Sequence, residues 1–219
     1  MAAKYKKTAF DDGRYQLTGG VQNGAKFPAA LVMGTKVDEY KGYTNTFVCF
    51  KVRTNVEGDV NHGWITAELN IPHAYEVFAY LKDIKHDSPK MTWEVSNFVF
   101  GKDRKRSEEP HVTATVTVWV KDDFVHIAVV DVRDTRRPKI AFKFGHNPRP
   151  RYPNTRTSSE DKFMVSKMAA GAYADAILAL LPAAINGAIA DKLAGIEDTT
   201  RDAPTSTSHD VDINDDMPF

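Results

Sequence analysis

The stretch HVTATVTVWVK at residues 111–121 decides the fold class. Apolar residues occupy every second position from Val112 to Val120, and threonines fill most of the positions between them. Because successive side chains of a β-strand point to opposite faces, this pattern predicts a strand with one apolar and one polar face. Trp119 falls on the polar face, so we expect its ring to point away from the core.

Similar short stretches, rich in β-branched and aromatic residues, recur between about Lys4 and His146. Turn sequences separate them: Gly19-Gly20, Glu57-Gly58-Asp59, Lys121-Asp122-Asp123 and Asp134-Thr135. One segment has helical spacing instead, because Pro72 suits a first helical turn and apolar residues then recur every three or four positions. These apolar residues are Val77, Phe78, Leu81 and Ile84. The pattern predicts a β-barrel or sandwich that a single helix interrupts.

A proline-rich basic segment at residues 147–153 predicts a stiff connector after the strands. Ser158, with Asp161 three residues later, resembles a capping box that would start a helix. The alanine-rich stretch from Phe163 to Ala194 predicts two helical pieces with a kink or break at Pro182. Its longest uncharged run is too short to span a bilayer.

From about Ile196 the sequence is polar and without periodicity, which predicts disorder. Residues 196–219 hold seven acidic residues against one arginine, a net charge of −6 that leaves +6 on the rest of the chain. We therefore divide the chain into two parts before the tail. Residues 1–148 are expected to form a barrel that binds a single nucleic-acid strand. Residues 149–195 are expected to form a basic linker and C-terminal helices, packed on the barrel or used for self-association. Residues 196–219 form an acidic tail.

Aromatic residues fall on otherwise polar strand faces, together with cations. Bases of a single strand stack on such rings without sequence preference, and cations follow the phosphates. The candidate stacking residues are Phe47, Trp64, Phe98, Phe100 and Trp119. The candidate phosphate-binding residues are Lys51, Arg53, Lys102, Arg104, Lys105, Arg106, Lys139, Lys143, Arg149 and Arg151. The alternative is that the C-terminal helices cover these rings and make them a second core layer.

The chain ends in Asp212-Ile213-Asn214-Asp215-Asp216-Met217-Pro218-Phe219, which resembles the C-terminal tip of bacterial single-stranded DNA-binding proteins. The layout is similar to that of phage replication proteins of the T7 type. This resemblance implies a mainly β fold with helices: an OB-like β-barrel with an inserted helix, a C-terminal helical appendage and a disordered acidic tail. It also implies a tip that binds a polymerase, helicase or recombinase through Asp212, Asp215, Asp216, Met217, Pro218 and Phe219.

The sequence shows no pattern typical of an active site or a metal site. Cys49 is the single cysteine, the seven histidines lack two-histidine zinc spacing, and there is no phosphate-binding glycine loop. We therefore expect no catalysis, no cofactor and no metal.

The expected function is to coat single-stranded DNA in phage replication, recombination and repair, in the cytoplasm of an infected bacterial host. The protein would form a homo-oligomer or act alone, without a membrane. Two alternatives stay open: a virion or assembly protein that does not bind nucleic acid, and, less favoured, a metal-dependent nuclease.

Overall fold

The structure is a computed structural model, and it describes residues 10, 15–40, 43–100, 105–145 and 161–194. In this part of the chain, eight strands form two antiparallel sheets of four strands each. The N-terminal sheet has the order β1 (Leu17–Val21), β2 (Pro28–Tyr40), β3 (Tyr43–Arg53) and β4 (Trp64–Asn70). The C-terminal sheet has the order β5 (Met91–Asn97), β6 (His111–Lys121), β7 (Phe124–Asp131) and β8 (Ile140–Lys143).

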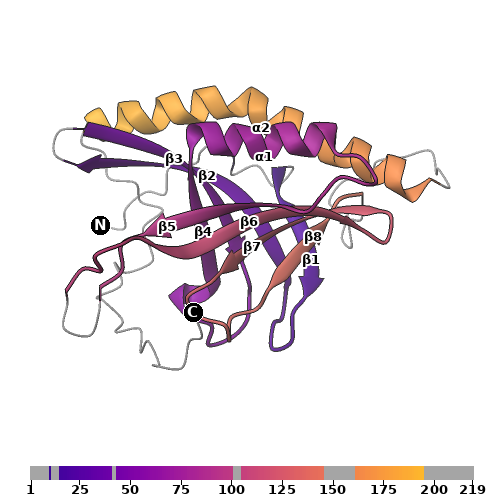
Figure 1. The fold of residues 1–219 in the computed structure, drawn as a ribbon, viewed down its shortest axis with the longest axis horizontal. Helices are drawn as coiled ribbons and strands as arrows, with labels where there is room; N and C mark the ends of the chain where they lie inside the picture. The colour runs from indigo at the N-terminus through magenta and orange to yellow at the C-terminus, as the bar shows by residue number, and fades with distance from the viewer. Residues whose placement is uncertain (1–9, 11–14, 41–42, 101–104, 146–160, 195–219) are drawn as a thin grey trace.

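Two α-helices and one short 3-10 helix (Asn61–Gly63) accompany the described strands. Helix α1 (Ile71–Asp83) connects the two sheets, and helix α2 (Lys162–Leu193) follows the last strand. Figure 1 shows α1 and α2 side by side over one end of the sheets, with the β3–β4 and β7–β8 loops at the other end. The prediction of a mainly β fold with an inserted helix and a C-terminal helix is confirmed.

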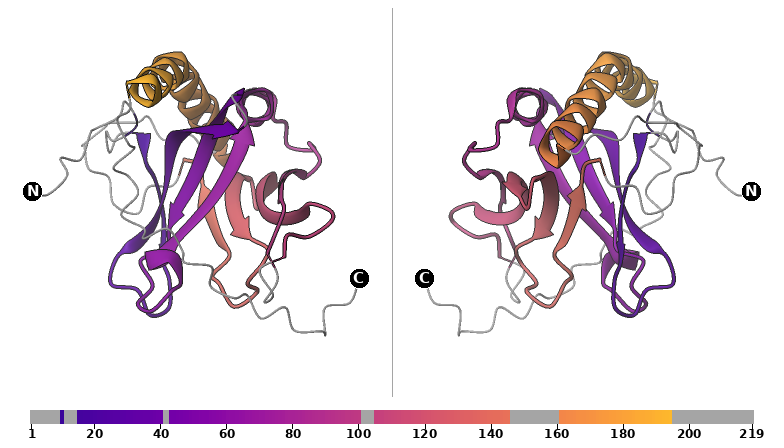
Figure 2. Two further views of the ribbon diagram at one scale, coloured as in Figure 1. Left: turned by 90° about the vertical axis from the view of Figure 1, so that its left-hand side faces the viewer. Right: turned by 90° about the vertical axis from the view of Figure 1, so that its right-hand side faces the viewer.

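The predicted strand faces are confirmed where the alternation is strongest. Val48, Phe50 and Val52 of β3 are fully buried, as are Val116 and Val118 of β6. The core faces of both sheets contribute to one hydrophobic core, so their other faces point outward. Figure 2 shows the sheets as two walls that meet beneath the helices.

The alternation is not complete, because Cys49 and Thr117 are buried although the sequence placed them on the polar faces. A β-bulge also shifts the register between β5 and β6. Val95 pairs with Ala114 but Ser96 pairs with Val112, which leaves Thr113 as the extra residue. We expected Thr113 on the polar face, yet it is buried, and its hydroxyl donates to the Val95 carbonyl over 3.1 Å. Strand β5 ends at Asn97, so Phe98 and Phe100 lie beyond the strand to which the sequence pattern assigned them.

The glycine pair Gly19-Gly20 lies inside strand β1, so the prediction of a turn there is wrong. A Cβ on Gly19 would lie 3.2 Å from Cε1 of Phe142 in β8. The glycine therefore allows close approach of the two sheets where β1 meets β8. The predicted turn at Lys121-Asp122-Asp123 is confirmed, because Asp122 and Asp123 have φ values of 51° and 63° that suit a two-residue hairpin.

Helix α1 begins as its sequence predicted. The side chain of Asn70 accepts a hydrogen bond from the backbone N–H of His73 over 2.9 Å, and Pro72 lies in the first turn. Its apolar side, formed by Ala74, Val77, Phe78 and Leu81, is fully buried. Burial of this side holds α1 over the core.

Helix α2 is one continuous helix, so the predicted break at Pro182 is wrong. Pro182 is exposed, while Leu181 before it and Ile185 after it are buried. The core contacts on both sides of the proline hold the helix together against a local cost of about 3 kcal/mol. The N-cap is Asp161, which accepts from the Met164 N–H over 2.8 Å; the predicted cap Ser158 lies outside the described residues.

By its length and apolar composition alone, α2 would be able to cross a membrane, and α1 would not. Here its inner side packs on α1, β2 and β7. Ala170, Ala174 and Ile177 are fully buried, and Asp175 pairs with Lys82 of α1 over 2.6 Å. One side of α2 therefore packs on the core, while only 33% of its most apolar 18-residue window is buried.

A buried serine on α2 bonds to strand β7 and to Phe144, the residue after β8. The Ser166 hydroxyl donates to the Phe144 carbonyl over 2.9 Å and accepts from the Val125 N–H over 2.8 Å. Ser166→Ala is expected to lower the free energy of unfolding by about 1–3 kcal/mol, because two buried backbone groups lose their partner.

The matched control for Ser166→Ala is Tyr173→Phe. The Tyr173 hydroxyl is buried and has no hydrogen-bond partner among the described residues, and this burial raises its pKa above the usual value of 10.0. Its removal is expected to leave stability unchanged or higher. Urea unfolding of both variants is the measurement, and equal losses would contradict the role of the Ser166 bonds.

Candidate nucleic-acid interface

The outer face of the N-terminal sheet brings four predicted site residues together. Phe47, Lys51 and Arg53 alternate along β3 with the fully buried core residues of that strand. Trp64, the first residue of β4, lies directly opposite Arg53 in the register. The Arg53 guanidinium carbon is 5.8 Å from the centroid of the half-buried Trp64 ring. This surface therefore combines an aromatic ring with cations on the face away from the core.

The same face also has acidic residues, and Lys36 of β2 neutralises them in part. Lys36 Nζ lies 2.8 Å from carboxylate oxygens of both Asp38 and Glu68. Burial lowers the pKa of Lys36, but the two carboxylates raise it more, so the net shift is upward. Lys36 is thus held between two acids, whereas Arg53 lies over the Trp64 ring and Lys51 lies opposite Thr66.

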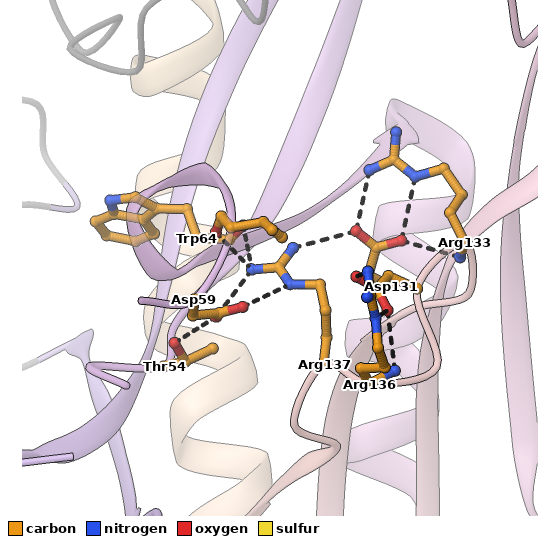
Figure 3. Close-up of polar contacts among 9 residues, drawn as sticks. Thr54, Asp59, Trp64, Asp131, Arg133, Arg136 and Arg137 are labelled. Carbon is orange, nitrogen blue, oxygen red and sulfur yellow. Dashed lines mark hydrogen bonds and ion pairs between the residues drawn. The ribbon is translucent and has the colours of Figure 1, made fainter. Parts of the chain in front are cut away.

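A buried arginine fixes the backbone at Trp64 (Figure 3). The Arg137 guanidinium donates to the carbonyls of Trp64 and Val60 over 3.0 and 3.2 Å, and to both carboxylate oxygens of Asp59 over 3.1 and 3.0 Å. The Thr54 hydroxyl donates to Asp59 over 2.7 Å. These bonds hold the backbone at the start of β4 and therefore fix the position from which the Trp64 side chain extends.

The same arginine reaches a second aspartate from the other sheet. Arg137 Nη1 donates to Asp131 over 3.1 Å, and Asp131 also receives two side-chain hydrogen bonds from Arg133. The Arg137 side chain is 2% exposed, and those of Asp59 and Asp131 are each 6% exposed. Burial alone would raise the pKa of Asp131, but the hydrogen bonds and charge of Arg133, together with Arg137, lower it overall. We call Asp59, Asp131 and Arg137 the inter-sheet cluster.

The inter-sheet cluster was not found from the sequence. Asp59 was assigned to a turn, and nothing in its neighbourhood indicates a partner 78 residues away. The one local signal is that Arg137 follows the turn Asp134-Thr135 between two strands. That signal does not distinguish a buried arginine from a solvated one.

Comparison with known proteins does not place the chain in a family. No family model matches it, and no curated protein matches it in sequence. Among the described residues, no group of three or more His, Cys, Asp or Glu side chains could hold a metal ion. The functional inference therefore depends on the geometry of the exposed faces.

The outer face of the C-terminal sheet carries Trp119 and Lys143, with Lys139 exposed just before β8. Trp119 stacks almost parallel on His126, with ring centroids 5.2 Å apart and planes at 12°. Lys143 Nζ lies 3.3 Å from the centroid of the Phe124 ring. Trp64 belongs to β4 and Trp119 to β6, so the two rings lie on the outer faces of different sheets. Figure 2 shows these sheets as two walls.

The remaining described candidates lie in the β5–β6 connection. Phe98 and Phe100 are 40% and 61% exposed, and the Arg106 guanidinium carbon is 3.6 Å from the Phe98 ring centroid. Lys105 is exposed beside them. Lys102, Arg104, Arg149, Arg151 and the tip residues Asp212, Asp215, Asp216, Met217, Pro218 and Phe219 lie outside the described residues. The candidates therefore form three separate groups.

Proposed function

We propose that the protein is a sequence-nonspecific single-stranded DNA-binding protein whose main surface is centred on Trp64 and Arg53. The observation that carries this proposal is the Arg53 guanidinium over the Trp64 ring, on a sheet face that continues to Lys51 and Phe47. Stacking on such a ring contributes about 1–3 kcal/mol per base, and neighbouring cations bind the phosphates. The backbone at Trp64 is held by Arg137, so the ring is positioned before the strand arrives.

The proposal includes an OB-like architecture. The N-terminal sheet is a curled half-barrel, β1 contacts β8, and β4 contacts β5, β6 and β7. Helix α1 lies between β4 and β5 in the chain and covers one end of the core. OB folds bind oligonucleotides on one face of a small barrel of this kind, with loops at its edges.

The proposed role is stoichiometric rather than catalytic. The protein would coat single strands during phage replication and recombination in the cytoplasm of an infected bacterial host. The charge split supports this role, because the chain outside residues 196–219 carries +6 and meets a polyanion favourably. The tip at 212–219 would recruit a polymerase, helicase or recombinase.

Trp64→Ala is expected to weaken binding of labelled oligo(dT) about 10- to 100-fold, because one stacked base is lost. The measurement is fluorescence anisotropy over a salt series, with thermal unfolding to show that the variant is folded. Tyr75→Ala is the matched control, since Tyr75 is an exposed aromatic residue on α1, away from the sheet faces. Failure of the unmodified protein to bind oligo(dT) at low salt would overturn the proposed function.

A self-associating assembly protein is the second candidate, and the surface of α2 favours it. Met164 and Met168 are exposed on this helix, and the run from Ala176 to Ala190 in its C-terminal half has no charged residue. Exposed apolar surface of this kind marks a contact with another molecule. The same titration separates the candidates, because an assembly protein would form oligomers and leave oligo(dT) unbound.

A further inference from the structure

The outer face of the C-terminal sheet carries a row of rings and lysines set by the strand register. Trp119 of β6 lies opposite His126 of β7, and His126 lies opposite Lys143 of β8. One step nearer the β6–β7 turn, Lys121 lies opposite Phe124. Three aromatic rings and two cations therefore occupy neighbouring positions on one face.

Two rings of this row are stacked on one another, and we call the row the platform. The Trp119 and His126 rings are stacked at 12°, and Lys143 lies over Phe124. Burial lowers the pKa of His126 below its usual value of 6.5, and Lys143 lowers it further, so the imidazole is neutral at pH 7. A neutral imidazole supports Trp119 as a second aromatic layer, and its buried Nδ1 has no hydrogen-bond partner among the described residues.

The charges around the platform suit a polyanion. Lys143 and Lys121 act on His126 together with Asp122, while Asp123 of the same turn pairs with His86 over 3.0 Å. Trp119, Phe124 and Lys143 are all partly exposed. By contrast, Val125 and Ile127, which alternate with Phe124 and His126 along β7, are fully buried in the core. A ring that only filled the core would sit on the other face of the strand.

We propose that the row formed by Trp119, Phe124, His126, Lys121 and Lys143 is a second stacking platform for single-stranded nucleic acid. This inference rests on the proposed function and extends it. Because Trp64 and Trp119 lie on the outer faces of different sheets, one nucleic-acid strand reaches both only by passing around an edge of the sheets. A long strand then wraps the domain, whereas a short strand occupies one platform at a time.

The wrapped arrangement has a consequence for stoichiometry. One OB fold covers about 4–16 nucleotides of single strand. With oligo(dT) near the lower end of that range, two separate platforms take two molecules per chain at saturation. With a strand several times longer, both platforms are filled by the same molecule, and one strand binds per chain.

The experiment compares the unmodified protein with Trp119→Leu and Trp119→Phe by calorimetric titration with short and long oligo(dT). We expect two short oligonucleotides per chain for the unmodified protein and for Trp119→Phe, and one for Trp119→Leu. Binding of the long strand by Trp119→Leu should weaken about 10-fold. In Trp64→Phe, quenching of the remaining tryptophan fluorescence should persist, because Trp93 is buried and Trp119 still meets the strand.

Several results would contradict the second platform. One short oligonucleotide per unmodified chain would do so, as would unchanged long-strand binding by Trp119→Leu or loss of all quenching in Trp64→Phe. If Trp119→Leu does not fold, the Trp64→Phe quenching decides the question. Loss of affinity in Trp64→Ala with no effect at Trp119 would leave the proposed function intact and reject this inference alone; no binding by any version rejects both.

Discussion

Arg137→Ala is expected to lower the free energy of unfolding by about 3–5 kcal/mol, one of the two largest effects predicted for a single substitution in this protein. Removal of the guanidinium leaves two nearly buried carboxylates, Asp59 and Asp131, without their shared cation. It also removes the donors to the Trp64 and Val60 carbonyls. Equilibrium unfolding in urea, followed by tryptophan fluorescence, measures the loss.

Arg136→Ala is the matched control for this prediction. Arg136 is the preceding residue and binds Asp134 through Nε and Nη2 over 2.9 and 3.0 Å, but its side chain is 87% exposed. Exposed ion pairs contribute little because solvent screens them. We expect no measurable change in unfolding for Arg136→Ala; equal losses in the two variants would show that burial of the inter-sheet cluster is not what stabilises the fold.

The stabilisation by Asp131 has a defined pH dependence. Burial opposes ionisation, but the arginines lower the pKa of Asp131 overall below its ordinary value of 3.8. A carboxyl group with a lower pKa in the folded state contributes stability that is fully present above the unfolded pKa. That contribution is lost as the pH falls below about 3.8 and through the folded pKa. At neutral pH the Asp131 carboxylate is therefore ionised.

Local periodicity predicted most of the strand faces, because each strand alternates independently of its partners. It placed Phe50 in the core and Trp119 outside, and both predictions hold. The errors arose where tertiary packing overrides a local rule. Gly19 serves close sheet packing rather than a turn, and Pro182 stays inside a helix that the core holds on both sides of it.

The candidate site was predicted as residue types on polar faces, and the sequence did not show which faces belong together. Trp64 and Trp119 look alike in the sequence, since each is an aromatic residue among polar neighbours. Strand order assigns one to each sheet and hence to the outer faces of different sheets. The residues that the sequence missed, His126 and Arg137, act through partners brought to them by that strand order.

Phe78→Ala is expected to lower the free energy of unfolding by about 3–5 kcal/mol, because it opens a cavity at the centre of the core. The Phe78 ring of α1 stacks on Phe50 of β3, with centroids 5.6 Å apart and planes at 21°, and both side chains are fully buried. Thermal and urea unfolding measure the loss, and Tyr75→Ala on the exposed side of α1 should change it little.

The Phe50–Phe78 contact also links the core to the proposed binding surface. Phe50 and Lys51 are adjacent on β3 and point to opposite faces. Helix α1 therefore packs against the core side of the same strand that presents Lys51 and Arg53 on its outer side. Because the two rings touch, the losses in Phe50→Ala and Phe78→Ala should not add in the double variant. At a temperature where Phe78→Ala stays folded, its oligo(dT) affinity should remain near that of the unmodified protein, since no stacking or phosphate contact is removed. A loss of affinity without unfolding would instead show that α1 controls the geometry of the outer face.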